Sequence, residues 1–168
     1  EYDDVLNTQR KIIYAQRLQV LEGKDVKDSI MKMIDDTIAH AVHAAIGENH
    51  LISLEMVEQA RRPFIGIFLR PDDCTFTAEE CDDLTAEQLT AELAEQAHKV
   101  YDAKEQALTS PIMRELERVI LLKNVDSKWM DHIDAMTELR NGIGLRAYGQ
   151  HDPVVEYKRE GFDMFDAM

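Results

Sequence analysis

The chain has 168 residues, and 45% of them are hydrophobic, which is enough to bury a substantial core in one domain or two small ones. Its 33 acidic residues outnumber 19 basic ones, and the net charge of −14 argues against general binding to nucleic acid or anionic lipid. No run of about 18 apolar residues occurs, and the first residues lack the pattern of a secretory signal. We therefore expect a cytoplasmic protein that neither spans a bilayer nor is exported.

Residues 1–47 have the pattern of two helical stretches interrupted at Gly23. Apolar side chains recur along one face of the first stretch, from Val5 to Val20. Asp25 can cap the second stretch, in which apolar residues keep a three- and four-residue spacing up to Gly47. An alternative is one long bent helix.

The pattern changes after Gly47. Ser53 can cap a short helix that Pro63 must disturb, because proline removes a backbone donor. The apolar segment Phe64–Leu69 could form a short strand, but no stretch alternates well enough to require a sheet. The sequence therefore predicts an all-α fold.

Two further helix starts follow at Thr77 and Thr85. Gln88 stands three residues after Thr85, in the spacing of a capping box, and we expect helix from there to about Leu108. Cys74 and Cys81 are separated by six residues without a second pair, which fits neither a disulfide framework nor a zinc ribbon. We interpret both cysteines as incidental thiols.

A long helix is predicted from Ser110 and Pro111, which can supply its cap and its first-turn proline. Its apolar residues recur mostly at three- and four-residue steps and form one stripe: Ile112, Leu116, Val119, Ile120, Leu122, Val125, Trp129, Ile133, Met136 and Leu139. A stripe of this kind needs a packing partner.

A chain reversal is expected after this helix, because Gly142, Gly144 and Gly149 permit backbone angles that other residues avoid. Asp152 can then cap a new helix with Pro153 at its first position. The pattern indicates a helical hairpin with a glycine-rich tip.

Catalytic motifs are incomplete in this sequence. The segment Gly144–Gly149 has the glycine spacing of a P-loop but continues without the lysine and the Ser/Thr hydroxyl, so we do not expect this chain alone to hydrolyse ATP. Ser127, Asp131 and His132 share one helix and cannot build a triad with an oxyanion hole. We predict no catalytic residue.

Metal binding is a weaker alternative. Asp36, His40 and His43 lie on neighbouring turns of one predicted helix and could offer three ligands, although histidines on a helix surface more often have no metal. Glu95 and His98 form half of a di-iron motif whose second half is missing. We predict no metal site.

Two aromatic residues have competing interpretations. Trp129 could pack between helices or could contact another domain or a polypeptide. Tyr148, at the apex of the reversal, could pack against the hairpin or present its ring to polypeptides of varied sequence.

The segments EYDDVLNTQRKIIYAQR, VDSKWMDHIDAM, LRNGIGLRAYGQ and EYKREGFDMF closely resemble the C-terminal helical region of SecA, a family of preprotein translocase ATPases. The resemblance implies that residues 1–47 form the first long scaffold helix, 48–105 an inserted helical wing, and 106–168 the scaffold's return with a two-helix finger. It places the finger loop at Asn141–His151. Gly144 and Gly149 depart from the family pattern, which has histidine and alanine there.

The resemblance also implies which residues make contacts. The finger-tip residues expected to contact polypeptide or channel are Tyr148, Arg146, Leu145 and Gln150. The candidates for contact with other domains are Asn7, Gln9, Arg10 and Trp129. The implied partners are the nucleotide-binding and preprotein-crosslinking domains of SecA, the SecYEG channel, and an unfolded preprotein or signal peptide.

The function implied is to couple ATP-driven domain motion to preprotein movement through SecYEG and to regulate the ATPase. ATP and Mg²⁺ would be bound by other parts of the parent protein, and this chain would need no cofactor. It would be cytoplasmic, and peripheral to the plasma membrane when bound to the channel. An autonomous helical protein-binding module and a helical-bundle metalloenzyme remain alternatives.

Overall fold

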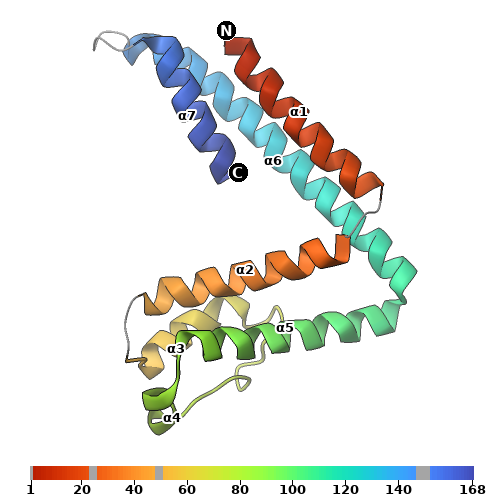
Figure 1. Cartoon of the computed structure of the whole chain (residues 1–168), viewed down its shortest axis with the longest axis vertical. Coiled ribbons are helices and arrows are strands. Elements are labelled where there is room, and N and C mark those ends of the chain that lie inside the picture. Colours follow the sequence, from red (N-terminus) through yellow and green to blue (C-terminus); the bar gives the residue numbers. More distant parts are fainter. Residues whose placement is uncertain (1, 23–25, 48–50, 147–151) are drawn as a thin grey trace. The chain divides into compact units, whose positions relative to one another are not determined.

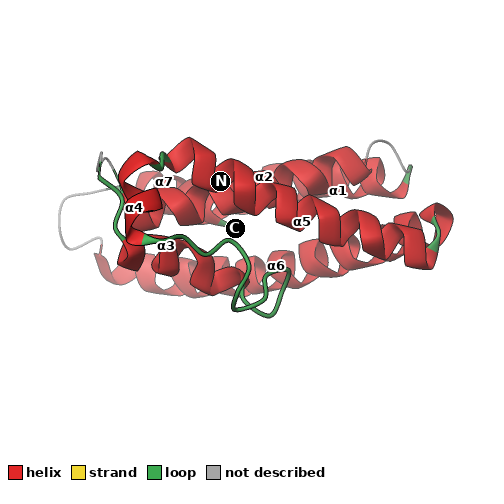
Figure 2. Ribbon diagram, turned by 90° about the horizontal axis from the view of Figure 1, so that it is seen from below, coloured by secondary structure: helices red, strands yellow, loops and turns green. Residues whose placement is uncertain are grey.

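The computed structural model describes residues 2–22, 26–47, 51–146 and 152–168. Its elements are α1 (Tyr2–Leu21), α2 (Val26–Ile46), α3 (Leu54–Arg61), the 3-10 helix η1 (Arg62–Phe64), α4 (Ala78–Asp83), α5 (Ala86–Leu108), α6 (Ser110–Arg146) and α7 (Pro153–Ala167) (Figure 1). In these ranges Figure 2 shows helices and loops without a strand, which confirms the all-α prediction. The strand considered at Phe64–Leu69 is reduced to a single bridge between Ile65 and Leu69.

The chain divides into two compact units, which we describe separately. Unit 1 comprises Glu1–Lys24 and Glu115–Met168, and unit 2 comprises Asp25–Arg114. Helix α2 belongs to unit 2 because it packs on both α3 and α5. The units are defined by which residues pack together. The predicted domain boundaries after residues 47 and 105 refer instead to the domains of the family, and they stay a prediction.

The core of unit 2 lies mainly between α2 and α5. Ile38, Val42 and Ile46 of α2 are almost completely buried, as are Leu89 and Leu93 of α5. Burial of an aliphatic side chain of this size contributes about 1.5–3 kcal/mol relative to exposure. Side chains of α3, η1 and α4 complete the same cluster, so the short elements depend on the two long helices.

The helix starts of unit 2 follow the predicted capping residues. The Ser53 hydroxyl accepts from a backbone N–H in the first turn of α3. Thr85 and Gln88 form the expected capping box, with N···O distances of 2.9 and 3.2 Å. Thr77 and Glu80 form a second one at α4. Each cap satisfies backbone donors that a helix leaves unpaired at its first turn.

In unit 1 the hairpin of α6 and α7 packs with α1. Met136 and Ile143 of α6 and Tyr157 of α7 are at most 2% exposed, and residues of α1 cover this cluster. The rings of Tyr2 and Tyr157 meet edge to face at 4.8 Å between centroids. Asp152 caps α7 as predicted, accepting from the Val154 N–H at 2.9 Å.

Helix α6 is longer at its C-terminal end than the sequence indicated. It continues through Gly142 and Gly144 to Arg146, so the expected loop start at Asn141 is wrong. Each helical glycine costs about 1 kcal/mol relative to alanine. Burial of Ile143 against Met136 and Tyr157, together with the continued backbone hydrogen bonds, offsets that cost.

At its other end α6 starts one residue earlier than predicted. Ser110, expected as the cap, is the first helical residue, and the Thr109 carbonyl accepts from the Met113 N–H at 3.0 Å. Thr109 is therefore the only residue between α5 and α6.

Candidate functional site

Two of the four predicted finger-tip residues belong to the described part of the chain, in unit 1. Leu145 and Arg146 belong to the last turn of α6, whereas Tyr148 and Gln150 lie outside the described residues. Helix α7 resumes at Pro153, so the tip is the short connection between the two long helices of the hairpin.

A buried glutamine links all three helices of unit 1. Gln9 of α1 is 5% exposed, and its amide nitrogen donates to the Gly161 carbonyl of α7 at 2.9 Å. Its amide oxygen lies 2.9 Å from Nε2 of His132 on α6. Because the glutamine oxygen faces the ring, this network assigns the imidazole hydrogen to Nε2.

The His132 ring lies among aromatic side chains. Its centroid is 5.6 Å from that of Trp129 and 5.6 Å from that of Phe165. Burial lowers the pKa of His132, because a charged imidazolium loses hydration there. A neutral histidine with a donated Nε2–H is therefore the form that fits this site.

Helix α7 approaches α6 closely at Gly161. A Cβ built on this glycine would lie 2.7 Å from Cε of Met136, closer than real carbon atoms pack. A larger residue at position 161 would force the Met136 side chain to shift, so the glycine permits the close approach of the second helix of the hairpin to the first.

Two ion pairs connect α1 and α6 near the surface. Arg17 contacts Asp126, and Arg140 contacts Asp3 at 3.3 Å. Partly exposed pairs of this kind contribute at most about 1 kcal/mol each. They align the helices, but the buried contacts carry more of the stability.

Of the four residues predicted to contact other domains, two are buried and two are exposed. Gln9 and Trp129 are buried in unit 1, whereas Asn7 and Arg10 of α1 are exposed. Only the latter two present their side chains to solvent, where another domain could reach them without rearrangement of the unit.

The predicted apolar stripe of α6 is covered along only part of its length. Trp129 and Met136 are buried, but Leu116, Val119 and Ile120 are exposed, while Met113 and Glu117 are buried instead. On α1, Tyr14, Leu18 and Leu21 are exposed in the same way. These six residues, which we name the exposed apolar set, have 42–55% of their surface accessible.

Spacing within the exposed apolar set follows helix geometry. Tyr14, Leu18 and Leu21 share one face of α1, and the three α6 residues share one face of that helix, since steps of three and four residues return to the same side. Rows of exposed apolar side chains along a helix are candidates for contact with another part of a protein.

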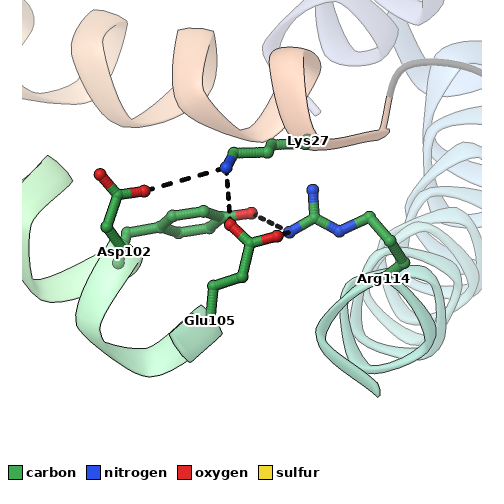
Figure 3. A network of polar contacts seen from close by, with 5 residues as sticks. Lys27, Asp102, Glu105 and Arg114 are labelled. Atoms are coloured by element: carbon green, nitrogen blue, oxygen red, sulfur yellow. Dashed lines mark hydrogen bonds and ion pairs between the residues drawn. The ribbon is translucent and has the colours of Figure 1, made fainter. Parts of the chain in front are cut away.

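Unit 2 contains a polar cluster that the sequence did not indicate (Figure 3). Lys27 of α2 pairs with Glu105 of α5 at 2.6 Å and with Asp102 at 3.8 Å. Arg114, in the first turns of α6, donates to Glu105 at 3.0 Å and to the Tyr101 hydroxyl at 2.8 Å. We name these five residues the Glu105 cluster.

Charge and hydrogen bonding within the Glu105 cluster reinforce one another. The hydrogen bond from Lys27 is the main cause that lowers the pKa of Glu105, and the same bond raises the pKa of Lys27. Lys27 also lies 5.3 Å from the centroid of the Tyr101 ring. No sequence motif signals the cluster, because Lys27 and Glu105 are 78 residues apart.

Metal-binding candidates from the sequence are not brought together as sites. In the described part of the chain, no group of three or more His, Cys, Asp and Glu side chains could hold a metal ion, and this includes Asp36, His40 and His43. His98 lies 2.7 Å from Asp35, and Glu95 pairs with Lys99. Of the helices in the described ranges, none combines the length and apolarity needed to cross a membrane.

Comparisons with known proteins match the entire chain. The family model of the SecA Wing and Scaffold domain matches residues 1–168. "Protein translocase subunit SecA" of Syntrophomonas wolfei is 44% identical over 175 residues, which cover 100% of this chain and 20% of the relative. Proteins of the same name are 46% identical in Clostridium perfringens, over 99% of this chain and 20% of the relative, and 44% identical in Acetivibrio thermocellus, over 100% and 18%. The chain thus spans at most 20% of the length of these relatives.

Proposed function

Because the chain belongs to the SecA family, as its wing and scaffold domain, we propose that it couples ATP-driven domain motion to preprotein movement through the SecYEG channel. The relatives are named protein translocase subunits, which supports a role in protein translocation. The coupling role is supported by one observation: in unit 1, a single continuous helix joins exposed apolar residues to the hairpin tip.

The dimensions of α6 suit a mechanical role. About 26 residues separate Ile120 from Arg146, which corresponds to roughly 40 Å of helix at 1.5 Å per residue. Over much of this length α6 is held by α1 and α7 through Gln9 and the packed Gly161. A helix that is supported by its neighbours bends little, so a displacement at one end is transmitted to the other end.

At the input end, we propose that the exposed apolar set binds the nucleotide-binding and preprotein-crosslinking domains of the parent protein. Asn7 and Arg10 lie exposed on α1 and would add polar contacts at the rim. ATP and Mg²⁺ would be held by those other domains. The chain would restrain their ATPase activity until channel and preprotein bind, without catalytic residues or a cofactor of its own.

At the output end, we propose that Tyr148 contacts the translocating polypeptide, with Leu145, Arg146 and Gln150 beside it. A tyrosine ring packs against backbone and varied side chains without requiring one sequence, which suits a surface that handles many substrates. The protein would work in the cytoplasm at the membrane face that carries SecYEG, on an unfolded preprotein or signal peptide, and without nucleic acid.

The tip assignment is tested by Tyr148→Ala in the full-length protein. We expect preprotein translocation into channel-containing vesicles to fall far more than basal ATP hydrolysis, while Tyr148→Phe, which keeps the ring, retains most translocation. Equal loss of both activities, or loss of neither, would contradict a polypeptide-contacting role for this residue.

The docking assignment is tested by mixing this chain with a separately expressed nucleotide-binding portion. Binding at micromolar concentration with suppressed ATPase activity is the expected result. Leu18→Ser with Val119→Ser should weaken binding, while Val155→Ser, which changes an exposed apolar residue on α7, serves as the matched control. Absence of binding by the unaltered chain would favour the autonomous binding module instead.

A further inference from the structure

The connection between α5 and α6 has an unusual backbone. Thr109 alone separates the two helices, and it has φ 72° and ψ 147°. Glycine adopts this region readily, whereas a β-branched residue does so only when its surroundings hold it there.

A continuous helix through Thr109 is the obvious alternative, because helix already extends to Leu108 and resumes at Ser110. That alternative has its own cost, since Pro111 would then lie inside a helix, where it lacks a donor and clashes with the preceding turn. In the observed structure, which we call the bent form, α5 and α6 are separated at Thr109 and the backbone is strained there. In the continuous form, helix would run through Thr109 and the strain would lie at Pro111. The two backbone costs are of the same order, which is the condition for an element with two accessible states.

The contacts of Arg114 exist only in the bent form. Arg114 follows Glu105 by nine residues, so a continuous helix would separate them by about 13.5 Å along the axis and place them on opposite faces. Tyr101 would be about 20 Å away along the same axis. The observed distances of 3.0 Å to Glu105 and 2.8 Å to the Tyr101 hydroxyl therefore require the bend.

The contacts of Lys27 do not depend on the bend. Lys27 lies on α2, and its partners Glu105 and Asp102 both lie on α5. Figure 3 shows the Lys27 and Arg114 side chains reaching Glu105 from different helices. Lys27 thus holds the Glu105 carboxylate in place, and Arg114 uses that carboxylate to fix the start of α6.

We propose that the α5–α6 junction is a two-state conformational switch, in which Thr109 is either bent or helical and the Arg114 contacts with Glu105 and Tyr101 select the bent state. The switch decides whether the first turn of α6 continues α5 or folds back toward it within unit 2. It goes beyond the proposed translocation function, and its test requires neither ATP nor a partner.

Spin labels on the two helices measure the state directly. Glu92→Cys on α5 and Ile112→Cys in the first turn of α6 are exposed positions within unit 2, and the buried Cys74 and Cys81 are replaced by alanine. A continuous helix would separate the labelled positions by about 30 Å, and the bent form gives a shorter distance, because Arg114 then reaches back to Glu105 and Tyr101. Pulsed dipolar spectroscopy on the 168-residue chain resolves the two populations.

We expect the unaltered chain to give the shorter distance. Arg114→Gln should raise the ratio of long to short distances roughly tenfold, since it removes charge-assisted hydrogen bonds found only in the bent state. Pro111→Ala should also raise the ratio, because it relieves the strain of the continuous helix. Lys27→Gln is the matched control and should leave the ratio within about twofold.

A second variant separates a shifted equilibrium from simple unfolding. Thr109→Gly relieves the strain of the bent state, so adding it to Arg114→Gln should return the population to the shorter distance. Helix content by circular dichroism should remain unchanged throughout. A single short distance in both Arg114→Gln and Pro111→Ala, or an equal shift in Lys27→Gln, would overturn the proposal.

Discussion

Gly161 of α7 lies against the thioether end of Met136 on α6, and a Cβ at position 161 would approach Cε to 2.7 Å and Sδ to 3.1 Å. Met136 is completely buried, so its flexible thioether end would have to repack within the core. We expect Gly161→Ala to destabilise unit 1 by about 1–3 kcal/mol, the usual cost of overpacking. Urea unfolding followed by the fluorescence of Trp129, the single tryptophan of the chain, measures this change.

Gly144 provides the matched control for that substitution. It is also helical, but a Cβ there would meet no atom within 4 Å. Gly144→Ala should therefore leave unit 1 as stable or raise its stability by up to about 1 kcal/mol through helix propensity alone. If both alanine substitutions changed stability in the same direction, close packing at Gly161 would not be the reason for its glycine.

The Gln9 bridge predicts a different kind of destabilisation. Gln9→Ala would leave the His132 Nε2–H and the Gly161 carbonyl buried without their present partner. An unpaired buried donor costs about 1–3 kcal/mol, and the Gly161 carbonyl keeps its bond within α7, so we expect a loss of roughly 1–3 kcal/mol by the same fluorescence measurement. Thr8→Ala, one position earlier on an exposed part of α1, should cost much less.

Stability of unit 1 should also depend on pH through His132. Burial lowers the pKa of His132 in the folded state, so the unfolded chain binds more protons as the pH falls below the ordinary value of 6.5. The stabilisation is therefore fully present above that pH and declines as the pH falls toward the lowered folded pKa. Urea midpoints between about pH 8 and 5 should show this decline, and His132→Gln should make it shallower. An unchanged slope in the variant would mean that other groups cause it.

The two thiols of unit 2 should be protected while that unit is folded. Burial raises the pKa of Cys74 from 9.0 to about 11, and it also raises the pKa of Cys81. At pH 8 the higher value reduces the Cys74 thiolate roughly hundredfold, and thiolate is the reactive form. Alkylation of Cys74 by iodoacetamide, followed by mass spectrometry, should be at least that much slower in the folded chain than in urea, and alkylation of Cys81 should be slowed as well. Equal rates would show that unit 2 opens readily.

Local features of the fold could be predicted because a few neighbouring residues determine them. Ser53, Thr85 and Asp152 cap the helices at which the sequence placed them, since a cap needs only its own hydroxyl or carboxylate and the next few N–H groups. The end of α6 could not be predicted in this way. The glycines favoured a turn, but burial of Ile143 depends on α1 and α7, which are remote in sequence.

The candidate site shows the same difference between local features, which a sequence indicates, and contacts between remote residues, which it does not. The tip residues were chosen by resemblance, and the structure describes Leu145 and Arg146 only as part of α6. The bridge from Gln9 to His132 joins residues 123 positions apart, so no spacing in the sequence indicates it. The α6 stripe was predicted to need a packing partner, and part of it is exposed in this chain. A periodic pattern shows that a surface needs a partner, but it does not show where that partner is encoded.

The buried guanidinium of Arg61 organises the segment between η1 and α4. It donates to the carbonyls of Pro71 and Asp73, and it also pairs with Glu58 on its own helix. Because Arg61 binds main-chain oxygens, its hydrogen bonds do not depend on which side chains face solvent along that segment. Natural variation should therefore accumulate there at low cost, while a lysine in place of Arg61 would lose the forked geometry that reaches both carbonyls.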